Sequence, residues 1–183
     1  GSDFDDLAPS DTEQVSFTYF ATDDNGANSS TKTVTITVTG TNDAPVASDD
    51  TQGTTENSIL NSSVPAASDV DGSIASYSLD TDVTSGSLTF NNDGSYSFDP
   101  GTAFDDLAVG ATEDVTFTYT ATDNNGAVSA TQTVTITVTG TNDGPVATDD
   151  AKGTTENIIL NSSVPVATDV DGTIASYSLV DDV

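Results

Sequence analysis

The sequence has no cysteine, histidine, methionine or tryptophan, and it has only two basic residues, Lys32 and Lys152. Without Cys and His, the chain lacks the side chains that most often act as nucleophiles, general bases or soft metal ligands. Nucleic acids and anionic membrane surfaces are excluded as partners, because both are bound mainly through Lys and Arg. No apolar run approaches the length of a membrane span.

Acidic residues, in contrast, are abundant: 30 Asp and Glu give the chain a formal charge of −28 at pH 7. Such a charge repels itself and destabilises a compact fold. Carboxylates a few ångströms apart repel each other by about 1 to 4 kcal/mol per pair. Bound divalent cations would relieve this repulsion. Ligands made of oxygen alone, with no thiolate or imidazole, select a hard ion, and calcium before zinc or copper.

The chain repeats itself with a period of one hundred residues. Residues 1–83 align without a gap on residues 101–183, and roughly three quarters of the aligned positions are identical. A fixed period of this kind indicates a tandem array of one structural unit. We therefore expect residues 1–43 to be the C-terminal half of one repeat, residues 44–143 a complete repeat, and residues 144–183 the N-terminal half of the next.

Apolar residues in the complete repeat alternate with polar ones, as in strands that have one buried face. About seven such segments in about 100 residues predict an all-β, immunoglobulin-like Greek-key β-sandwich. No helical periodicity of useful length is present. Asn91–Gly94 has the composition of a hairpin turn, and 103–110 is expected to be an irregular crossover. The expected strands are 46–48, 54–60, 73–79, 87–90, 95–98, 114–121 and 128–139.

The core of this sandwich is expected to be thin. Alternation directs Ala75, Tyr77 and Leu79 inward from one strand, and two further strands contribute mainly Val, Ile, Phe and Tyr. Each large apolar side chain contributes about 1.5 to 3 kcal/mol on burial, which leaves little margin against the conformational entropy of the chain. Metal binding to the folded form would add stability by mass action.

Acidic residues are concentrated at turns and at the hinge between repeats. The alternating strand Val134–Thr139 runs into Gly140–Pro145, and a near-identical copy of both begins at Val34. Asp69–Gly72, repeated as 169–172, places two carboxylates on one side of a turning backbone. It lacks the third acid and the distal Glu of an EF-hand loop. We interpret the hinge as half of a calcium site between repeats.

Two of the acidic motifs also have simpler explanations. Asp123–Gly126 ends a strand and has the composition of an ordinary hairpin turn. Glu56, which follows a Thr pair near the start of the repeat, is compatible with a solvated surface carboxylate. The sequence alone leaves both explanations open.

Segments 117–127 and 139–145 together resemble the end of a VCBS-type repeat, and segments 86–96 and 104–110 resemble its earlier part. The resemblance covers essentially the whole chain. Such repeats occur in tandem in giant bacterial surface proteins, notably RTX-type biofilm adhesins exported by type I secretion. The resemblance therefore implies an extracellular protein at the bacterial cell surface.

The same residues resemble cadherin repeats more distantly, which implies a cadherin-like sandwich with calcium ions at each junction. By this resemblance the first junction would use Asp5, Asn42, Asp43, Asp69, Asp71 and Asp123. The second would use Glu56, Asp105, Asn142, Asp143, Asp169 and Asp171. Segment 104–107 lacks the cadherin Glu, and Ala44 and Gly144 stand where a linker Asn would be. We therefore expect fewer ions per junction than in cadherins.

The function expected from these observations is that of a calcium-stabilised structural extender of a bacterial biofilm adhesin, because near-identical repeats serve reach and stiffness. The alternative is a module that binds a glycan or a host protein, through Tyr77, Tyr96 and Tyr119 if they are exposed. An enzyme is not expected. Asp105 and Asp106 would be the paired carboxylates of a hydrolase, but acids adjacent on an extended chain point apart.

The expected partners are adjacent repeats of the same chain. The two terminal halves, 1–43 and 144–183, contain complementary strands, the late ones and the early ones of a repeat. We expect these halves to pair with each other, within or between molecules. The composite would lack only the counterpart of residues 84–100.

Overall fold

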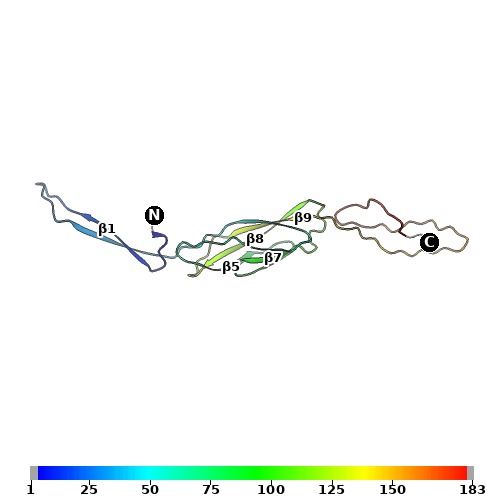
Figure 1. Ribbon diagram of the computed structural model, residues 1–183, viewed down its shortest axis with the longest axis horizontal. Coiled ribbons are helices and arrows are strands. Elements are labelled where there is room, and N and C mark those ends of the chain that lie inside the picture. Colours follow the sequence, from blue (N-terminus) through cyan, green and yellow to red (C-terminus); the bar gives the residue numbers. More distant parts are fainter. Residues whose placement is uncertain (1–3, 181–183) are drawn as a thin grey trace.

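A computed structural model describes residues 4–180, and all of its regular elements are β-strands. The molecule is a rod of three parts that follow one another along its long axis (Figure 1). A two-stranded hairpin lies at one end, a β-sandwich in the middle, and a tail of residues 144–180 at the other end. No helix long and apolar enough to cross a membrane is found among the described residues.

The middle part is a sandwich of two sheets. One sheet has the strand order β3-β9-β8-β5 and the other β4-β7-β6. β3 runs parallel to β9, and the other pairs are antiparallel. The expectation of an all-β sandwich of seven strands is confirmed. The strands are β3 (Asp50–Thr55), β4 (Leu60–Ser63), β5 (Ile74–Thr81), β6 (Ser87–Phe90), β7 (Ser95–Asp99), β8 (Thr112–Asp123) and β9 (Gln132–Thr139).

The core lies between these two sheets and holds the inward side chains of the alternating strands. Phe98 of β7 and Phe104 of the crossover are fully buried. The ring of Tyr96 meets the ring of Phe117 edge to face, with 5.0 Å between their centroids, an arrangement that aromatic pairs favour. β8 and β9 supply the rest of the most buried residues, which are Val115, Phe117, Tyr119, Ala121, Val134, Ile136 and Val138.

The first two expected strands of the repeat are wrong. Segment 46–48 forms only an isolated bridge. Segment 54–60 is interrupted, because β3 ends at Thr55 and β4 begins at Leu60. Between them the amide of Ser58 donates to the carbonyl of Thr55 at 3.1 Å and closes a turn. The chain leaves the ladder here because Glu56 is buried and bonds to the hinge described below rather than facing solvent.

The predictions made from strict alternation are also wrong for two residues further along the chain, Ala75 and Val128. Ala75 is exposed, because a β-bulge after Ile74 shifts the register of β5 on β8 and turns the following side chains over. The last strand begins at Gln132 rather than at Val128. Val128 forms only an isolated bridge and is 52% exposed.

The N-terminal hairpin repeats the last two strands of the sandwich. β1 (Thr12–Tyr19) pairs with β2 (Lys32–Thr39) in the register that β8 and β9 use one hundred residues later. Among the described residues no further strand joins this sheet. The same side chains that fill the core in the middle part are therefore largely exposed in the hairpin, including Phe17 at 53% and Tyr19 at 51%.

The tail keeps one feature of the sandwich, the bridge between Val146 and Thr168, which matches a bridge between Val46 and Ser68. Residues 144–180 form no regular strand, so the expectation that they supply early strands is not met in the described part of the chain. The physical reason is that β7, β8 and β9, the ladder partners of those strands, have no counterparts beside the tail among residues 4–180. Hairpin and tail lie at opposite extremes of the rod (Figure 1).

Replacing Phe117 with Ala should lower the free energy of unfolding by about 3 to 5 kcal/mol, because Phe117 is fully buried between the sheets. Phe17→Ala is the matched control, since Phe17 holds the same place in β1 but is 53% exposed. Urea unfolding of dilute protein should show a loss below about 1 kcal/mol for the control. Comparable losses for the two variants would contradict the placement of the core in the middle part.

Candidate metal centres

The first candidate site surrounds the hinge formed by Asn42 and Asp43, here called the first hinge. Two acidic turns of the sandwich reach it. The amide of Asp43 donates to Asp71 Oδ2 at 3.2 Å, which ties the hinge to the loop before β5. The side-chain amide of Asn42 donates to Asp123 Oδ2 at 2.7 Å, which ties it to the turn after β8. The hinge is thus joined to both turns by direct hydrogen bonds.

The carboxylates of Asp123 and Asp69 are held in place by hydrogen bonds within their own turns. Asp123 Oδ1 accepts hydrogen bonds from the backbone amides of Asn125 and Ala127, both at 2.8 Å. Asp69 Oδ1 accepts one from the amide of Asp71 at 3.3 Å. This is the usual way in which Asp stabilises a turn. The turn explanation of Asp123 is therefore correct as far as it goes, and its second oxygen still serves the hinge.

The remaining oxygens at the first hinge are short of donors. Asp69 Oδ2, Asp71 Oδ1 and Asn42 Oδ1 are buried and have no hydrogen-bond partner among the described residues. Asp71 is only 9% exposed and Asp123 only 2%. A buried polar atom without a partner is costly, and a buried charge more so. The first hinge therefore holds negative charge that the surrounding protein does not balance.

The pKa shifts of Asp69 and Asp123 are consistent with a lack of hydrogen-bond donors at the first hinge. Burial raises the pKa of Asp69; a hydrogen bond from the backbone of Asp71 opposes the rise, and the charges of Asp71 and Asp123 add to it. The pKa of Asp123 is lowered, chiefly because the Asn42 side chain donates to it. Donors thus suffice for one carboxylate of the hinge and not for its neighbour.

The second candidate site surrounds Asn142 and Asp143, here called the second hinge. Glu56 Oε1 accepts hydrogen bonds from the amide and the hydroxyl of Thr141, at 2.6 and 2.8 Å. Its other oxygen, Oε2, is buried without a partner in the described part of the chain. Because Glu56 is only 1% exposed, the explanation of this residue as a solvated surface carboxylate is wrong.

The crossover carries Asp105 to the same hinge. Two backbone bonds hold the crossover there: Gly140 donates to the carbonyl of Ala111 at 2.8 Å, and Gly110 donates to the carbonyl of Gly140 at 3.0 Å. A Cβ atom at position 140 would collide with the backbone carbonyl of Leu107. Only glycine permits so close an approach, so Gly140 fixes the distance between the crossover and the hinge.

Carboxylates from three other segments of the chain lie close enough to Asp143 to shift its pKa. Burial raises the pKa of this carboxyl, and the charges of Glu56, Asp105 and Asp171 raise it further. Glu56 and Asp105 belong to the sandwich, whereas Asp171 belongs to the tail. The amide of Asp143 donates to Asp171 Oδ2 at 3.3 Å. The second hinge is therefore a place where carboxylates of two successive repeats approach one another.

The two hinges share the same local geometry. The bond from Asp143 to Asp171 repeats the bond from Asp43 to Asp71. Both Asn side chains donate to the carbonyl of the following Asp, at 3.0 Å in the first hinge and 2.8 Å in the second. Unpartnered buried oxygens also recur, on Asp169 and Asp171. Because the tail has no regular strands, this geometry follows from the local sequence.

Most of the residues expected to bind metal lie at the hinges. The structure joins Asn42, Asp43, Asp69, Asp71 and Asp123 at the first, and Glu56, Asp105, Asp143 and Asp171 at the second, with Asp169 in the turn beside Asp171. Asn142 is exposed, and among residues 4–180 its side chain bonds to Asp143 alone. Asp5 is exposed in the turn before β1, and no hydrogen bond joins it to the first hinge within residues 4–180.

Sequence reasoning missed Asn124. Its side-chain oxygen accepts hydrogen bonds from the amide and the hydroxyl of Ser73, at 2.7 and 3.2 Å. These bonds hold the loop that carries Asp69 and Asp71. The available signal was its position directly after Asp123, since Asn accepts such bonds as readily as Asp does. Asn124 positions the acidic loop against the turn after β8.

The donor chemistry at both hinges fits a hard divalent cation. Every side chain concerned ends in a carboxylate or an amide oxygen, the ligands that calcium prefers, and several of these oxygens are buried without donors. No three of the acidic side chains in the described part of the chain already converge as a formed metal-binding cluster. The hinges thus offer ligands of the right chemical kind, not yet gathered into a cluster of three acids.

The two alternatives to metal binding, a glycan-binding surface and a hydrolase site, have less support in the structure. Tyr96 and Tyr119 are buried at 3% and 0% exposure, and Tyr77 is packed against the core, so these rings offer no face to a glycan. Asp106 is exposed, whereas Asp105 lies close enough to the second hinge to act on Asp143. The two adjacent carboxylates thus lie in different surroundings.

A family model of the bacterial cadherin-like domain matches residues 42–140. Among solved structures, the chain is similar to the mouse clustered PcdhgC3 EC1-3, with 11% sequence identity and a TM-score of 0.36. The match covers 71% of this chain and 55% of the mouse chain. No curated protein matches. Because the matched family model covers more than half of the 183 residues, the chain belongs to the bacterial cadherin-like domain family.

Proposed function

We propose that this protein is a calcium-stabilised extender repeat of a bacterial cell-surface adhesin. Membership of the cadherin-like domain family supports an adhesion or extender repeat. Calcium is supported by one observation: within residues 4–180, carboxylate oxygens at both hinges are buried without hydrogen-bond donors, namely those of Asp69 and Asp71 at the first hinge and those of Glu56, Asp169 and Asp171 at the second. The chain cannot neutralise them itself, because Lys32 lies in β2 and Lys152 pairs with Asp150 in the tail.

The residues that would hold the ion differ between the two hinges. Asp69, Asp71 and Asp123 would provide the charged ligands at the first hinge. At the second hinge, Glu56, Asp105 and Asp143 would act from the sandwich side, together with Asp169 and Asp171 from the following repeat. Bound calcium would supply the positive charge that these groups lack, and the energy of its binding would add to the stability of the fold.

The rod would be stiff because the ligands of one ion would belong to two successive repeats. At the second hinge Glu56 and Asp105 belong to one repeat and Asp171 to the next. An ion bound by both sets would fix the angle between the repeats, whereas repulsion among the same carboxylates would drive them apart in its absence. A string of small domains would thereby become a rod, which suits a protein that must hold a binding site away from a cell.

The location we propose is the bacterial cell surface. Extracellular calcium modules bind their ion at about 10⁻⁴ to 10⁻³ M, so calcium would be bound outside a cell and lost inside it. The finer assignment that forms part of this proposal is a VCBS-type repeat of an RTX-type biofilm adhesin exported by type I secretion. Its support is the resemblance of segments 86–96, 104–110, 117–127 and 139–145 to such repeats.

Replacing Asp71 with Asn keeps an acceptor for the amide of Asp43 but removes the charge. In calcium at about ten to a hundred times its dissociation constant, the bound ion contributes about 1.4 to 2.7 kcal/mol. Each kcal/mol shifts the melting temperature of a domain of about 100 residues by about 4 to 8 °C, so we expect Asp71→Asn to lower it in calcium by about 6 to 20 °C and to change it little in chelator. Asp106→Asn, at an exposed acid within the crossover, is the matched control. Equal losses in both conditions would refute metal binding by Asp71.

The raised pKa of Asp143 predicts a pH dependence with a definite sign. A carboxyl whose pKa is raised by folding contributes most below its ordinary pKa, and that contribution is lost as the pH rises through the raised value. In chelator, Asp143→Asn should therefore be more stable than the wild type at pH 7, and the difference should vanish toward pH 4. In calcium at pH 7 the order should reverse. Thermal melts of both proteins, with Asp149→Asn as control, test this; a variant weaker in both conditions contradicts it.

Solution scattering with and without calcium tests the stiffness of the whole chain. Calcium should lengthen the particle and narrow its distribution of interatomic distances, because the hinges lose angular freedom. Chelator should give a shorter and broader distribution without unfolding the sandwich, which circular dichroism monitors in parallel. Identical profiles in the two conditions would leave calcium without a mechanical role.

A further inference from the structure

The turn after β8 contains Asn125–Gly126, an asparagine followed directly by glycine, and the same pair recurs in the sequence only at Asn25–Gly26. Glycine has no Cβ atom, so nothing shields its backbone nitrogen from the side-chain amide of the residue before it. Both residues of the pair in the sandwich are exposed. Gly126 has a positive φ of 94°, and a Cβ atom built on it would meet nothing within 4 Å. Solvent therefore has free access to this peptide bond.

Few hydrogen bonds hold the two groups that would react here. The backbone nitrogen of Gly126 donates to the carbonyl of Asp123 at 3.3 Å, which is longer than the usual range of about 2.7 to 3.2 Å. The amide nitrogen of the Asn125 backbone bonds to Asp123, but its side chain has no partner among residues 4–180. The neighbouring Asn124, in contrast, accepts two hydrogen bonds from Ser73 with its side-chain oxygen and is not followed by glycine.

Aspartates that precede glycine in the sandwich could form the same cyclic product, but they are better protected. Asp71 is only 9% exposed, and a Cβ atom at Gly72 would lie 2.7 Å from the side-chain oxygen of Asn124, so the approach is crowded. Asp93 Oδ1 accepts hydrogen bonds from the amide and the hydroxyl of Ser95, at 3.0 and 2.6 Å. An ionised carboxylate also resists attack by a nucleophile. Asn125 is therefore the most reactive of these side chains.

We propose that Asn125 is a site of spontaneous deamidation, and that its isoaspartate product releases the turn that holds Asp123 at the first hinge. The backbone nitrogen of Gly126 loses its proton to hydroxide and attacks Cγ of Asn125. The new N–Cγ bond closes a cyclic imide, the Cγ–Nδ2 bond breaks, and ammonia leaves with a proton taken from water, which restores the hydroxide.

Water then opens the imide at either of its two carbonyl groups. Cleavage of the bond between Cγ and the nitrogen gives aspartate in a normal backbone. Cleavage of the bond between the backbone carbonyl carbon and the nitrogen gives isoaspartate, in which the chain runs through Cβ and Cγ. Overall one water is consumed and one ammonia is released, and nothing is oxidised or reduced.

Isoaspartate adds one carbon to the backbone between Cα of residue 125 and the nitrogen of Gly126. The amide of Ala127, which donates to Asp123 Oδ1 at 2.8 Å, lies beyond this insertion. So does the carbonyl of Ala127, which accepts from the amide of Asp123 at 3.0 Å. Asp123 thus loses two of the bonds that orient it. Because Asp123 Oδ2 accepts the side-chain amide of Asn42 at 2.7 Å, the first hinge would loosen as well.

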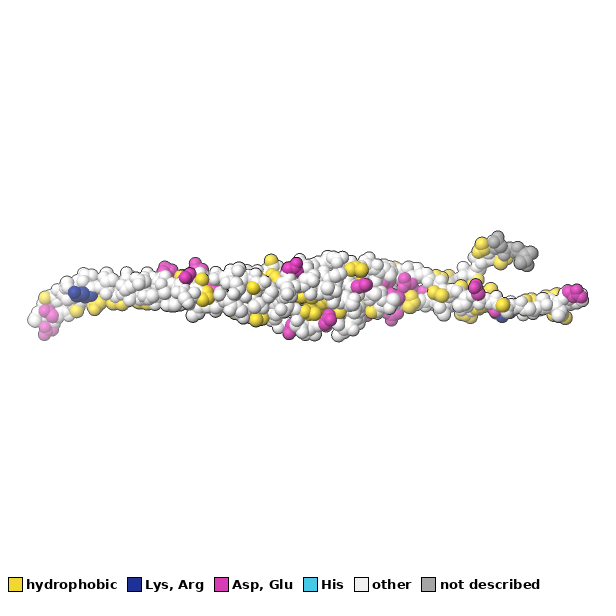
Figure 2. All heavy atoms as spheres, turned by 90° about the horizontal axis from the view of Figure 1, so that it is seen from below, with side chains coloured by type: hydrophobic (Ala, Val, Ile, Leu, Met, Phe, Trp, Pro, Cys, Tyr) yellow, Lys and Arg dark blue, Asp and Glu magenta, His cyan; other side chains and the backbone are white. Residues whose placement is uncertain are grey.

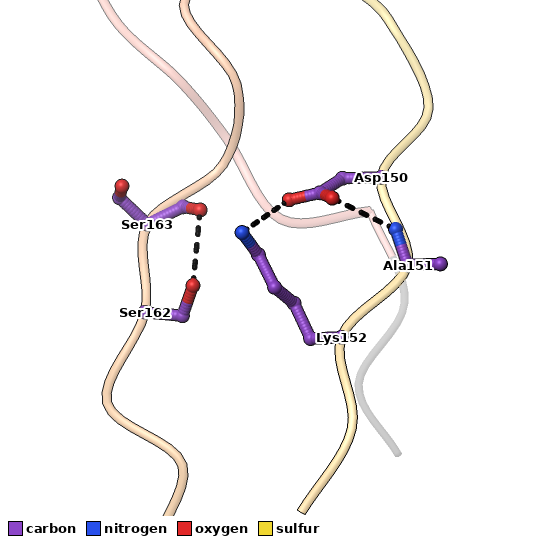
Figure 3. A network of polar contacts seen from close by, with 5 residues as sticks. All are labelled: Asp150, Ala151, Lys152, Ser162 and Ser163. Atoms are coloured by element: carbon purple, nitrogen blue, oxygen red, sulfur yellow. Dashed lines mark hydrogen bonds and ion pairs between the residues drawn. The ribbon is translucent and has the colours of Figure 1, made fainter.

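The charge of the chain slows this reaction. Negative charge develops on the attacking nitrogen, and Figure 2 shows acidic side chains at intervals along the visible face of the rod. Neither lysine is placed to offset them, because Lys32 lies in β2 and Lys152 pairs with Asp150 Oδ2 at 2.7 Å in the tail (Figure 3). Salt screens the repulsion, and the Debye length falls to about 3 Å at about 1 M.

The test incubates the full chain in chelator and about 1 M salt, at neutral and at alkaline pH. Chelator makes the result independent of whether the first hinge binds calcium. Peptide mass mapping measures conversion at Asn125, and methylation by an isoaspartyl methyltransferase measures isoaspartate. Asn125→Gln is the matched control, because its amide is kept but would have to close a larger ring. Asn125→Asp carries the charge of the normal product on an unaltered backbone.

Wild-type protein should acquire isoaspartate at position 125, faster at alkaline pH, and Asn125→Gln should not. The isoaspartate form, isolated by chromatography, should melt about 4 to 8 °C below fresh protein, because backbone hydrogen bonds of the turn are lost. In its NMR spectrum the side-chain amide protons of Asn42 should exchange faster with solvent, since their acceptor is Asp123. Fresh Asn125→Asp should match fresh wild type in both measurements.

Three results would overturn the proposal. The first is absence of conversion at Asn125 under conditions that convert the urea-unfolded chain, because the folded turn would then block the attack. The second is conversion that leaves the melting temperature and the exchange of the Asn42 amide unchanged. The third is an equal loss in fresh Asn125→Asp, which would assign the effect to the added charge and not to the lengthened backbone.

Discussion

Unbalanced negative charge at the hinges is the constraint on which the rest of this structure depends. The acidic turns at 69–72 and 123–126 are folded by their own hydrogen bonds, and they bring further carboxylate oxygens to the first hinge, where Asp123 Oδ2 has a donor and Asp69 Oδ2 and Asp71 Oδ1 have none among residues 4–180. Hydrogen bonds from Asn42 and from the amide of Asp43 satisfy only part of this charge. A cation that bridges the turns would complete the network, and the same bridge would make the hinge rigid.

A comparison of the hairpin with the sandwich shows that the sequence of two paired strands does not determine whether their side chains are buried. β1 with β2 and β8 with β9 have nearly the same sequence and the same register. Within residues 4–180, strands pair with the outer edges of β8 and β9 and a second sheet packs on them, so this pair is the centre of a core. No strand in that range pairs with the outer edges of β1 and β2, and their apolar side chains are largely exposed. Burial is thus a property of the whole repeat, and repeats of this kind gain stability from completeness and from their neighbours.

Prediction from the sequence succeeded where periodicity and turn chemistry act alone. β6 was placed correctly, and β7 and β8 nearly so, and Gly94 adopts a positive φ of 84° in the expected hairpin turn. It failed where a tertiary contact interrupts the pattern. Glu56 breaks the strand expected at 54–60 because its carboxylate bonds to Thr141, 85 positions away. Ala75 faces solvent because of a bulge that no alternation rule reveals.

The sequence by itself determined the all-β class, the hundred-residue period, the oxygen-only ligands and the positions of the acidic turns. These follow from local composition and spacing, which is why both hinges repeat the same bonds even where no strands form. Only the tertiary structure decided that Asp123 reaches Asn42, that Glu56 and Asp105 approach Asp143, and which apolar side chains are buried. Those properties depend on contacts between segments far apart in the chain, and such contacts exist only when the sheets have closed around the core.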